Sequence, residues 1–181
     1  AANYSSAVNK LILINPIGLE DYSKYVEFKD VNFFYKNELA KTLDKARDYQ
    51  KANYYDGKWS SEYEQLLVPV KGMLAGDDWQ VIAWNNALTY GPIFSENIVD
   101  RFSQITNKTV LIIGTRDKTG PGKGWLKEGV TRTLGDYKNL GVNTQKLIKG
   151  SVLIELDGLG HMPQFENYDV FIKAFHQAIE P

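Results

Sequence analysis

Three short runs of mostly apolar residues constrain the fold of this chain more than any other feature. They span Leu11–Ile14, Val110–Ile113 and Val152–Leu156. Each run is too short for a buried helix and is rich in β-branched residues, which suits a strand covered on both faces. Turn-forming residues follow each run, namely Asn15-Pro16, Gly114-Thr115-Arg116-Asp117 and Asp157-Gly158-Leu159-Gly160-His161. The pattern predicts an α/β fold, with three parallel strands flanked by helices.

The lengths between the runs predict how the chain is organised. The 38 residues at 114–151 make an ordinary crossover, with a helix expected from about Trp125 to Leu140 and ended by Gly141. The 95 residues at 15–109 exceed what a crossover needs and contain several helical patterns. We therefore expect the α/β core at 1–24 and 101–181, with an inserted helical subdomain at 25–100.

Apolar spacing and capping residues predict the other helices. Inside the insertion we expect one helix along the stripe Tyr35, Leu39, Leu43 and Ala46 to about Tyr49, and another after Ser61, kinked by Pro69. A third should run from Asp77 or Asp78 to Tyr90 and end at Gly91-Pro92. It is apolar on two faces, as in a helix sandwiched between a core and a pocket. A last helix is expected at about Asn167 to Ile179.

Asp117 and His161 are the residues best placed for chemistry. Asp117 lies four residues past the second apolar run, and His161 lies five residues past the third. If the two strands are neighbours, both side chains emerge at the same rim of the sheet, where sites of open parallel sheets form. A carboxylate there can fix the tautomer of a histidine and stabilise its imidazolium form.

The sequence lacks the nucleophile that such a pair needs. No Ser stands in a G-x-S-x-G elbow, and Ser151, which follows Gly150, precedes its strand and so lies at the far end of the sheet. With no Cys, thiolate nucleophiles and thiolate metal sites are excluded, and no cluster of His and carboxylates indicates a metal. A formal net charge of −1 does not favour nucleic acid or an anionic membrane surface as partners.

Several of these motifs together resemble the α/β-hydrolase fold. Residues 10–21 are similar to its sixth strand and the following loop, and residues 111–117 to its seventh strand with the acid of the triad. The stretch Gly158-Leu159-Gly160-His161-Met162-Pro163-Gln164-Phe165-Glu166 is similar to the loop after its eighth strand, which bears the catalytic histidine. Residues 84–90 resemble the helical cap of one group of bacterial α/β hydrolases. The resemblance covers essentially the whole chain.

The resemblance implies a C-terminal half of such an enzyme. Strands one to five, the oxyanion loop and the nucleophile elbow have no counterpart in the sequence, which opens Ala1-Ala2-Asn3 without Met. We therefore expect a complementary N-terminal half that supplies the nucleophile, a small-molecule substrate, and no activity of this chain alone. No organic cofactor or metal is implied. A cytoplasmic and a periplasmic location both stay open.

The resemblance also implies roles for individual residues. His161 would be the general base and Asp117 the residue that orients it, while Glu20 or Asp21, after the first strand, is the alternative acid. The helical cap would line an apolar pocket, with Trp79, Trp84, Tyr90 and Phe94 as candidates. A Ser in the absent elbow would imply hydrolysis of an ester, amide or related acyl compound, and an Asp would imply a dehalogenase or epoxide hydrolase. A non-catalytic fragment or ligand-binding module is the other alternative.

Overall fold

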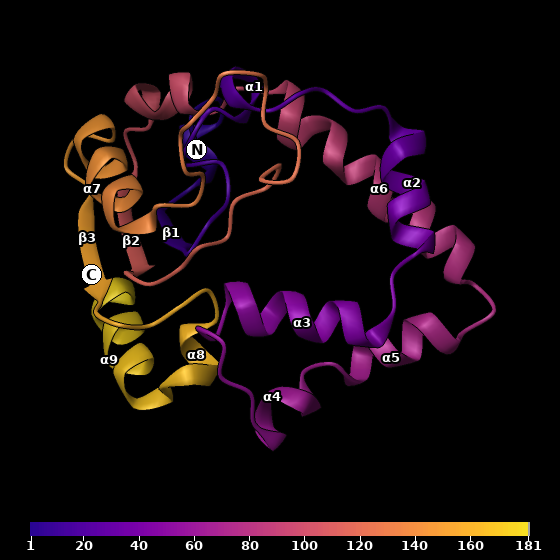
Figure 1. The fold of residues 1–181 in the computed structure, drawn as a ribbon. Helices are drawn as coiled ribbons and strands as arrows, with labels where there is room; N and C mark the ends of the chain where they lie inside the picture. The colour runs from indigo at the N-terminus through magenta and orange to yellow at the C-terminus, as the bar shows by residue number, and fades with distance from the viewer. Residues whose placement is uncertain (181) are drawn as a thin grey trace.

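The three predicted strands form one parallel sheet. The computed structural model describes residues 1–180, with β1 (Lys10–Ile14), β2 (Lys108–Gly114) and β3 (Val152–Leu156) in the order β1-β2-β3 (Figure 1). In register, Ile12 lies opposite Val110, and Leu111 lies opposite Leu153. The prediction of three parallel strands flanked by helices is confirmed.

The two faces of the sheet are covered by different helices. Leu111 and Ile113 point to the face that packs on α7 (Tyr137–Leu147) and the 3-10 helix at Val99–Gln104. The alternate residues, Val110 and Ile112, point to α9 (Tyr168–Ile179) on the other face. Both faces of β2 are therefore buried, which is why its apolar run shows no polar alternation.

Strand β1 forms one edge of the sheet. Among residues 1–180 it pairs only with β2, and its residues are half-buried up to Ile14, which is 36% exposed. An apolar strand with unpaired backbone groups on one side is a template for pairing with another strand. The structure thus leaves an open position beside β1.

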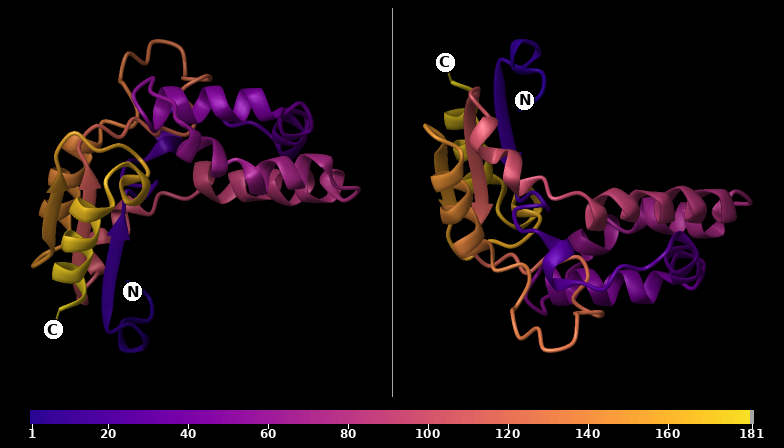
Figure 2. Two further views of the ribbon diagram at one scale, coloured as in Figure 1. Left: turned by 90° about the horizontal axis from the view of Figure 1, so that it is seen from below. Right: turned by 90° about the horizontal axis from the view of Figure 1, so that it is seen from above.

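The long connection between β1 and β2 is helical, as predicted. Its helices are α1 (Tyr22–Tyr25), α2 (Val31–Leu39), α3 (Leu43–Asn53), α4 (Ser61–Gln65), α5 (Val68–Ala75) and α6 (Trp79–Ser95). Figure 2 shows α2 to α6 extending as an arm from the end of the sheet where the strands finish. Both ends of the described chain lie at the opposite end of the sheet. We call α2 to α6 the helical arm.

Stacked aromatic rings hold the base of the helical arm together. The ring of Phe34 on α2 lies between those of Tyr90 and Phe94 on α6, with centroid distances of 4.4 and 5.7 Å and nearly parallel planes. Trp125, from the loop after β2, packs edge-on against Phe34 at 5.9 Å. Pairs of this geometry contribute about 0.5–1.5 kcal/mol beyond the area that they bury. They join the arm to the loop that carries Asp117.

A charged contact joins α3 to α4 in the second half of the arm. The guanidinium of Arg47 donates to both carboxylate oxygens of Glu64, at 2.8 and 2.7 Å, and the indole of Trp59 donates at 2.9 Å. These donors lower the pKa of Glu64 to about 2. The contact is exposed, so it orients the two helices more than it stabilises them.

The predicted helix through Tyr35 and Ala46 is two helices. The first ends at Leu39, and the second starts at Leu43 with Thr42 as its N-cap, whose hydroxyl accepts from the backbone N–H of Lys45 at 3.2 Å. The apolar spacing continues across the break although the two helices pack on different partners, α2 on α6 and α3 on α5. The N-cap at Thr42 therefore starts a second helix where the apolar spacing alone predicts a continuous one.

Two prolines also act differently from the sequence prediction. Pro69 stands in the first turn of α5, where its missing N–H costs nothing, so it starts a helix instead of kinking one. Pro92 lies inside α6, which continues to Ser95. The buried ring of Phe94, beyond the proline, packs on Phe34 and Tyr22, and this packing carries the helix past the expected stop.

The predicted helix from Trp125 to Leu140 is wrong over most of its length. Residues 115–136 form a long loop, and α7 begins only at Tyr137. Gly141 lies inside α7, where a Cβ atom would come within 3.2 Å of Ile113 and 3.3 Å of Leu153. This glycine lets the helix approach the sheet closely and does not end it. The last predicted helix is confirmed as α9.

Helix α6 is covered on only one of its two apolar faces. Ala83 and Ala87 are buried, whereas Val81 and Leu88 are 60% and 50% exposed. The expected sandwich is therefore absent from the described residues. None of the described helices is long and apolar enough to cross a membrane.

Replacing the central strand residue Ile112 by Ala should destabilise the fold. Its side chain is fully buried between β1, β3 and α9, so Ile112→Ala should lower the free energy of unfolding by about 2–5 kcal/mol. Leu147→Ala, at an exposed position of α7, is the matched control and should change it by less than about 1 kcal/mol. Denaturant unfolding followed by circular dichroism measures both. Equal losses would contradict the placement of the core.

Candidate functional site

Two loops meet where β2 and β3 end. The backbone N–H of Thr115 donates to the carbonyl of Leu156 at 3.1 Å, and that of Arg116 donates to the carbonyl of Leu159 at 2.9 Å. The loop after β2 and the loop after β3 therefore run side by side. This is the neighbouring arrangement of strands that the sequence prediction required.

These loops bring Asp117 and His161 together. The Nδ1 atom of His161 lies 2.7 Å from Oδ2 of Asp117. Asp117 is 2% exposed, and its Oδ1 accepts from the backbone N–H of Thr119 at 2.7 Å. The His161 side chain keeps 18% of its surface accessible, and its Nε2 makes no hydrogen bond to any residue from 1 to 180. One ring nitrogen is thus held by a buried carboxylate while the other stays available to exchange a proton.

Asn15 connects the ends of all three strands. Its Nδ2 donates to Oδ2 of Asp117 at 2.7 Å and to the carbonyl of Gly160 at 3.2 Å, and its Oδ1 accepts from the backbone N–H of Gly114 at 2.9 Å. Asn15 is buried and has a φ of +40°, a left-handed conformation that Asn tolerates better than most residues. The side chain fixes the Asp117 carboxylate relative to the loop that carries His161.

Glycines allow the two loops to approach so closely. A Cβ atom on Gly114 would stand 2.5 Å from the carbonyl oxygen of Gly160, and a Cβ atom on Gly160 would overlap the carbonyl oxygen of Tyr54. In both cases the obstacle is backbone, which does not move aside as a side chain can. Gly160 therefore joins the histidine loop to the end of α3 in the arm.

A partly buried ion pair strengthens the same junction. The guanidinium of Arg116 contacts the carboxylate of Glu166, which also accepts from the backbone N–H of Gly160. Arg116 further donates to the carbonyls of Gly158, at 2.9 Å, and Tyr54, at 3.4 Å. One side chain thereby binds the loops on both sides of His161 and the end of α3.

Tyr54 places the helical arm directly against His161. The centroids of their rings are 4.5 Å apart, with planes inclined by 37°. Burial raises the pKa of the Tyr54 phenol, and the neighbouring charges, Asp117 among them, raise it further, so the hydroxyl stays protonated. Tyr54 also lines a cleft of about 740 Å³ between the arm and the loop at 120–125. Tyr54 therefore belongs to the cleft lining and contacts His161, which is not itself one of the lining residues.

Two of the four predicted pocket residues line this cleft. Trp79 and Tyr90 do, whereas Phe94 lies in the buried aromatic stack and Trp84 packs edge-on against Tyr35 at 5.3 Å. The structure thus places Trp84 and Phe94 outside the cleft lining. Both belong to a helix with apolar residues all around, so spacing along the helix does not separate residues that line the cleft from those that support it.

The alternative acids occupy other positions. Glu20 is buried, with its carboxylate 3.2 Å from the guanidinium of Arg132 and 2.7 Å from the backbone N–H of Gly135. Asp21 is the N-cap of α1 and accepts from the backbone N–H of Ser23 at 3.1 Å. Neither makes a hydrogen bond to His161 within the described chain. Both carboxylates hold loops in place.

The sequence analysis missed the residues that support the site. Asn15, which directly follows β1, could have been found from the rule that sites gather at the carboxyl ends of strands. Tyr54, Arg116 and Glu166 carry no comparable signal, because their contacts join segments far apart in the chain. Across residues 1–180, no three His, Asp or Glu side chains come together as a metal site would need.

Removing the Asn15 side chain should loosen the site. Asn15→Gly keeps the left-handed backbone but leaves the backbone N–H of Gly114 without its acceptor, which should cost about 1–3 kcal/mol. Asn15→Ala should cost about 1–2 kcal/mol more because of the positive φ. Thermal and denaturant unfolding measure both, and Asn139→Ala, at an exposed position, is the control. If Asn15→Ala loses no more free energy of unfolding than Asn139→Ala, Asn15 does not connect the strand ends as described.

A side chain at Gly160 should separate the histidine loop from the arm. In Gly160→Ala the added methyl overlaps the Tyr54 backbone, so the loop must shift and the contact between the Tyr54 and His161 rings should break. The imidazole resonances of His161, followed by NMR, should change strongly. Gly72→Ala, inside α5 with open space around its Cβ position and without a positive φ, is the control. An unchanged His161 spectrum in Gly160→Ala would contradict the junction.

Comparisons with known proteins agree with this geometry. No protein-family model matches the chain, and no curated protein matches it. The crystal structure of a probable hydrolytic enzyme from Pseudomonas aeruginosa PAO1 is 34% identical, with a TM-score of 0.94, and the match covers 100% of this chain and 58% of that one. An α/β hydrolase enzyme from a Medee basin deep-sea metagenome library is 14% identical, with a TM-score of 0.57, over 99% of this chain and 60% of its own.

The chain therefore spans less than two thirds of the length of each of these two proteins. Its three parallel strands, the helices on both faces of the sheet and these likenesses identify it as a part of the α/β-hydrolase fold.

Proposed function

We propose that this chain supplies the histidine and the acid of a hydrolase that acts by nucleophile, histidine and acid. The observation that carries the proposal is the 2.7 Å contact between Nδ1 of His161 and the buried Oδ2 of Asp117, at the carboxyl ends of adjacent strands. The similarity to a probable hydrolytic enzyme over the whole chain supports it. The substrate would be a small ester, amide or related acyl compound.

The geometry suits His161 to act as a general base. Asp117 accepts from Nδ1–H, which leaves the lone pair of Nε2 directed away from the carboxylate. In the proposed mechanism Nε2 takes the proton of the nucleophile and later returns it to the leaving group. Asp117 stabilises the imidazolium that forms in between. Because Asn15 and the Thr119 N–H hold its carboxylate, this group needs little rearrangement during the reaction.

The nucleophile in this proposal comes from a segment outside the present sequence. No serine here stands in an elbow between glycines, and the edge of β1 has no partner among residues 1–180. A complementary segment that carries further strands would pair with this edge and bring its nucleophile to the same rim as His161. The matched proteins, about 40% of whose length lies outside the match, support such a segment.

The helical insertion would be the cap of this hydrolase. In the proposed division, residues 25–100 cover the site, and residues 1–24 and 101–181 form the core. The contact of Tyr54 with His161 and the cleft that Tyr54 lines favour this assignment. The cap would then choose the substrate, while the core loops carry the chemistry.

Substitution of His161 or Asp117 should abolish hydrolysis. In the protein assembled from this chain and its complementary segment, His161→Ala should lower the rate of p-nitrophenyl acetate hydrolysis by about 10³-fold or more, and Asp117→Asn by a similar factor. His176→Ala, on an exposed position of α9, is the matched histidine control. Glu20→Gln and Asp21→Asn test the alternative acids and should keep activity wherever their thermal stability is unchanged.

Three results would argue against the proposal. Full activity of His161→Ala would show that another base acts. Hydrolysis by the 181-residue chain alone would show that the nucleophile lies within it. Turnover of haloalkanes or epoxides, with none of acyl esters, would favour a carboxylate nucleophile over a serine.

A further inference from the structure

The wall of the cleft beside His161 carries positive charge only. Three lysines line it, Lys41, Lys45 and Lys123, and no Asp or Glu does. The chain as a whole has a formal net charge of −1, so this excess is a local arrangement. A cleft wall of one sign concentrates ligands of the opposite sign.

Two of the three ammonium groups have no carboxylate partner in the described structure. Lys41 lies 2.6 Å from the carboxylate of Glu38, which neutralises it. Lys45 donates to the backbone carbonyl of Ala40 at 2.8 Å, and Lys123 donates to the backbone carbonyl of Lys118. Each of these two ammonium groups keeps further donors for a ligand.

The carboxylate that pairs with Lys41 is already satisfied. Glu38 is buried and accepts from Lys41, from the side-chain amide of Asn86 at 3.1 Å and from the hydroxyl of Tyr90 at 3.3 Å. It therefore has little charge left to offset Lys45. Lys123, by contrast, lies in the field of Asp117 and Glu20, which opposes the lowering of its pKa by burial.

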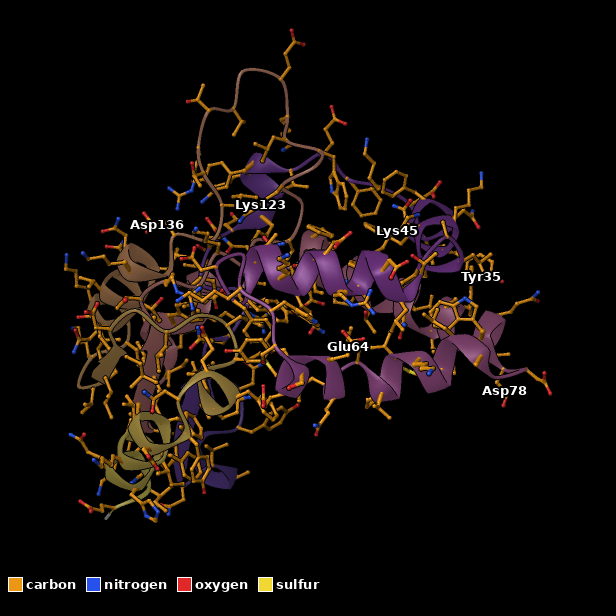
Figure 3. All side chains as sticks on the ribbon, turned by 60° about the horizontal axis from the view of Figure 1, so that its bottom comes forward. Tyr35, Lys45, Glu64, Asp78, Lys123 and Asp136 are labelled. Atoms are coloured by element: carbon orange, nitrogen blue, oxygen red, sulfur yellow. The ribbon has the colours of Figure 1, made fainter. Side chains whose placement is uncertain are left out.

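Helix α3 sets the distance between Lys45 and His161. Lys45 lies in its first turn, and Tyr54, which contacts His161, follows its last residue. Nine residues of helix span about 14 Å. Figure 3 shows Lys45 and Lys123 toward opposite ends of α3. Lys45 therefore lies at the end of α3 away from Tyr54, whereas Lys123 lies toward the end where Tyr54 contacts His161.

Five of the residues in the cleft wall are aromatic. They are Tyr49, Tyr54, Trp79, Tyr90 and Trp125. Gln50, which lies on the same side of α3, has a buried Oε1 without a hydrogen-bond partner among the described residues. Such a surface suits an apolar or aromatic body with a polar group at each end.

We propose that the cleft binds an organic acid, whose carboxylate contacts Lys45 and whose apolar body lies along α3 toward Tyr54. This proposal rests on the proposed function only for the bond that is cleaved: besides its free carboxylate, the substrate would carry a separate ester or amide group at the other end of its body, and that group would react with the help of His161. Lys123 adds to the positive potential of the wall. The acid group selects the substrate, and it takes no part in the bond that breaks.

Binding of a matched pair of ligands tests this proposal with the 181-residue chain itself. The probes are 6-phenylhexanoate and its neutral analogue 6-phenylhexanamide, titrated by calorimetry. We expect the carboxylate to bind about tenfold more tightly than the amide, since a hydrogen bond to a charged group is worth more than one to a neutral group. Higher salt should reduce this preference.

Lysine variants locate the contact. Lys45→Gln should lower the affinity for 6-phenylhexanoate by about tenfold and leave that for the amide unchanged, and Lys123→Gln should have a smaller effect in the same direction. Lys138→Gln, on an exposed position of α7 away from the cleft, is the matched control and should change neither.

Two results would overturn the proposal, and both are distinct from a failure of the proposed function. Equal affinities for the acid and the amide would show that the cleft does not select an anion. A preference that survives in Lys45→Gln and Lys123→Gln would place the anion elsewhere. Because no bond is cleaved in these titrations, the anion site can stand even if no ester is hydrolysed, and hydrolysis can be observed even if the anion site fails.

Discussion

A carboxylate withdrawn from solvent at the meeting point of three strand ends organises this molecule. A buried charge is tolerated only when its oxygens are hydrogen-bonded, and Asp117 accepts from the side chain of Asn15, from the backbone of Thr119 and from the ring of His161. These partners come from the ends of β1, β2 and β3. Satisfying one carboxylate therefore aligns the loops after all three strands, and the open nitrogen of His161 is a consequence of that alignment.

The loop that carries His161 also contacts the helical arm, and this contact couples the arm to the site. The loop that presents His161 is pressed against the end of α3 through Gly160, and Arg116 and Glu166 close the contact with charged hydrogen bonds. A partly buried ion pair of this kind contributes more to a specific geometry than to net stability, because desolvation offsets part of its attraction. A ligand that moves α3 would thus act on the ring of Tyr54 and, through it, on His161.

The parts that could be predicted from the sequence are those determined by neighbours along the chain. Continuous β-branched runs predicted the strands, and the topology rule for parallel sheets predicted that Asp117 and His161 lie at one rim. The misplaced helix ends depend on tertiary contacts instead: Pro92 is carried inside α6 by the packing of Phe94, and Gly141 serves the approach of α7 to the sheet. Asn15 escaped notice because its three partners are close only after folding. The sequence shows four aromatic residues in the segment that forms α6 but not which of them reach the cleft.

The distribution of charge lets anion binding at Lys45 and proton transfer at His161 occur at different places. At physiological ionic strength the screening length is about 8 Å, shorter than the span of α3, so Lys45 has little effect on the chemistry beside His161. Its charge acts on the part of a ligand within its reach. Lys123 stands in the field of Asp117 and Glu20 and is partly offset there. An anion that contacts Lys45 is therefore held at the end of α3 away from Tyr54, whose ring contacts His161. An acid-bearing substrate would lie in one direction along α3, with its neutral acyl group toward the ring nitrogen that can take a proton.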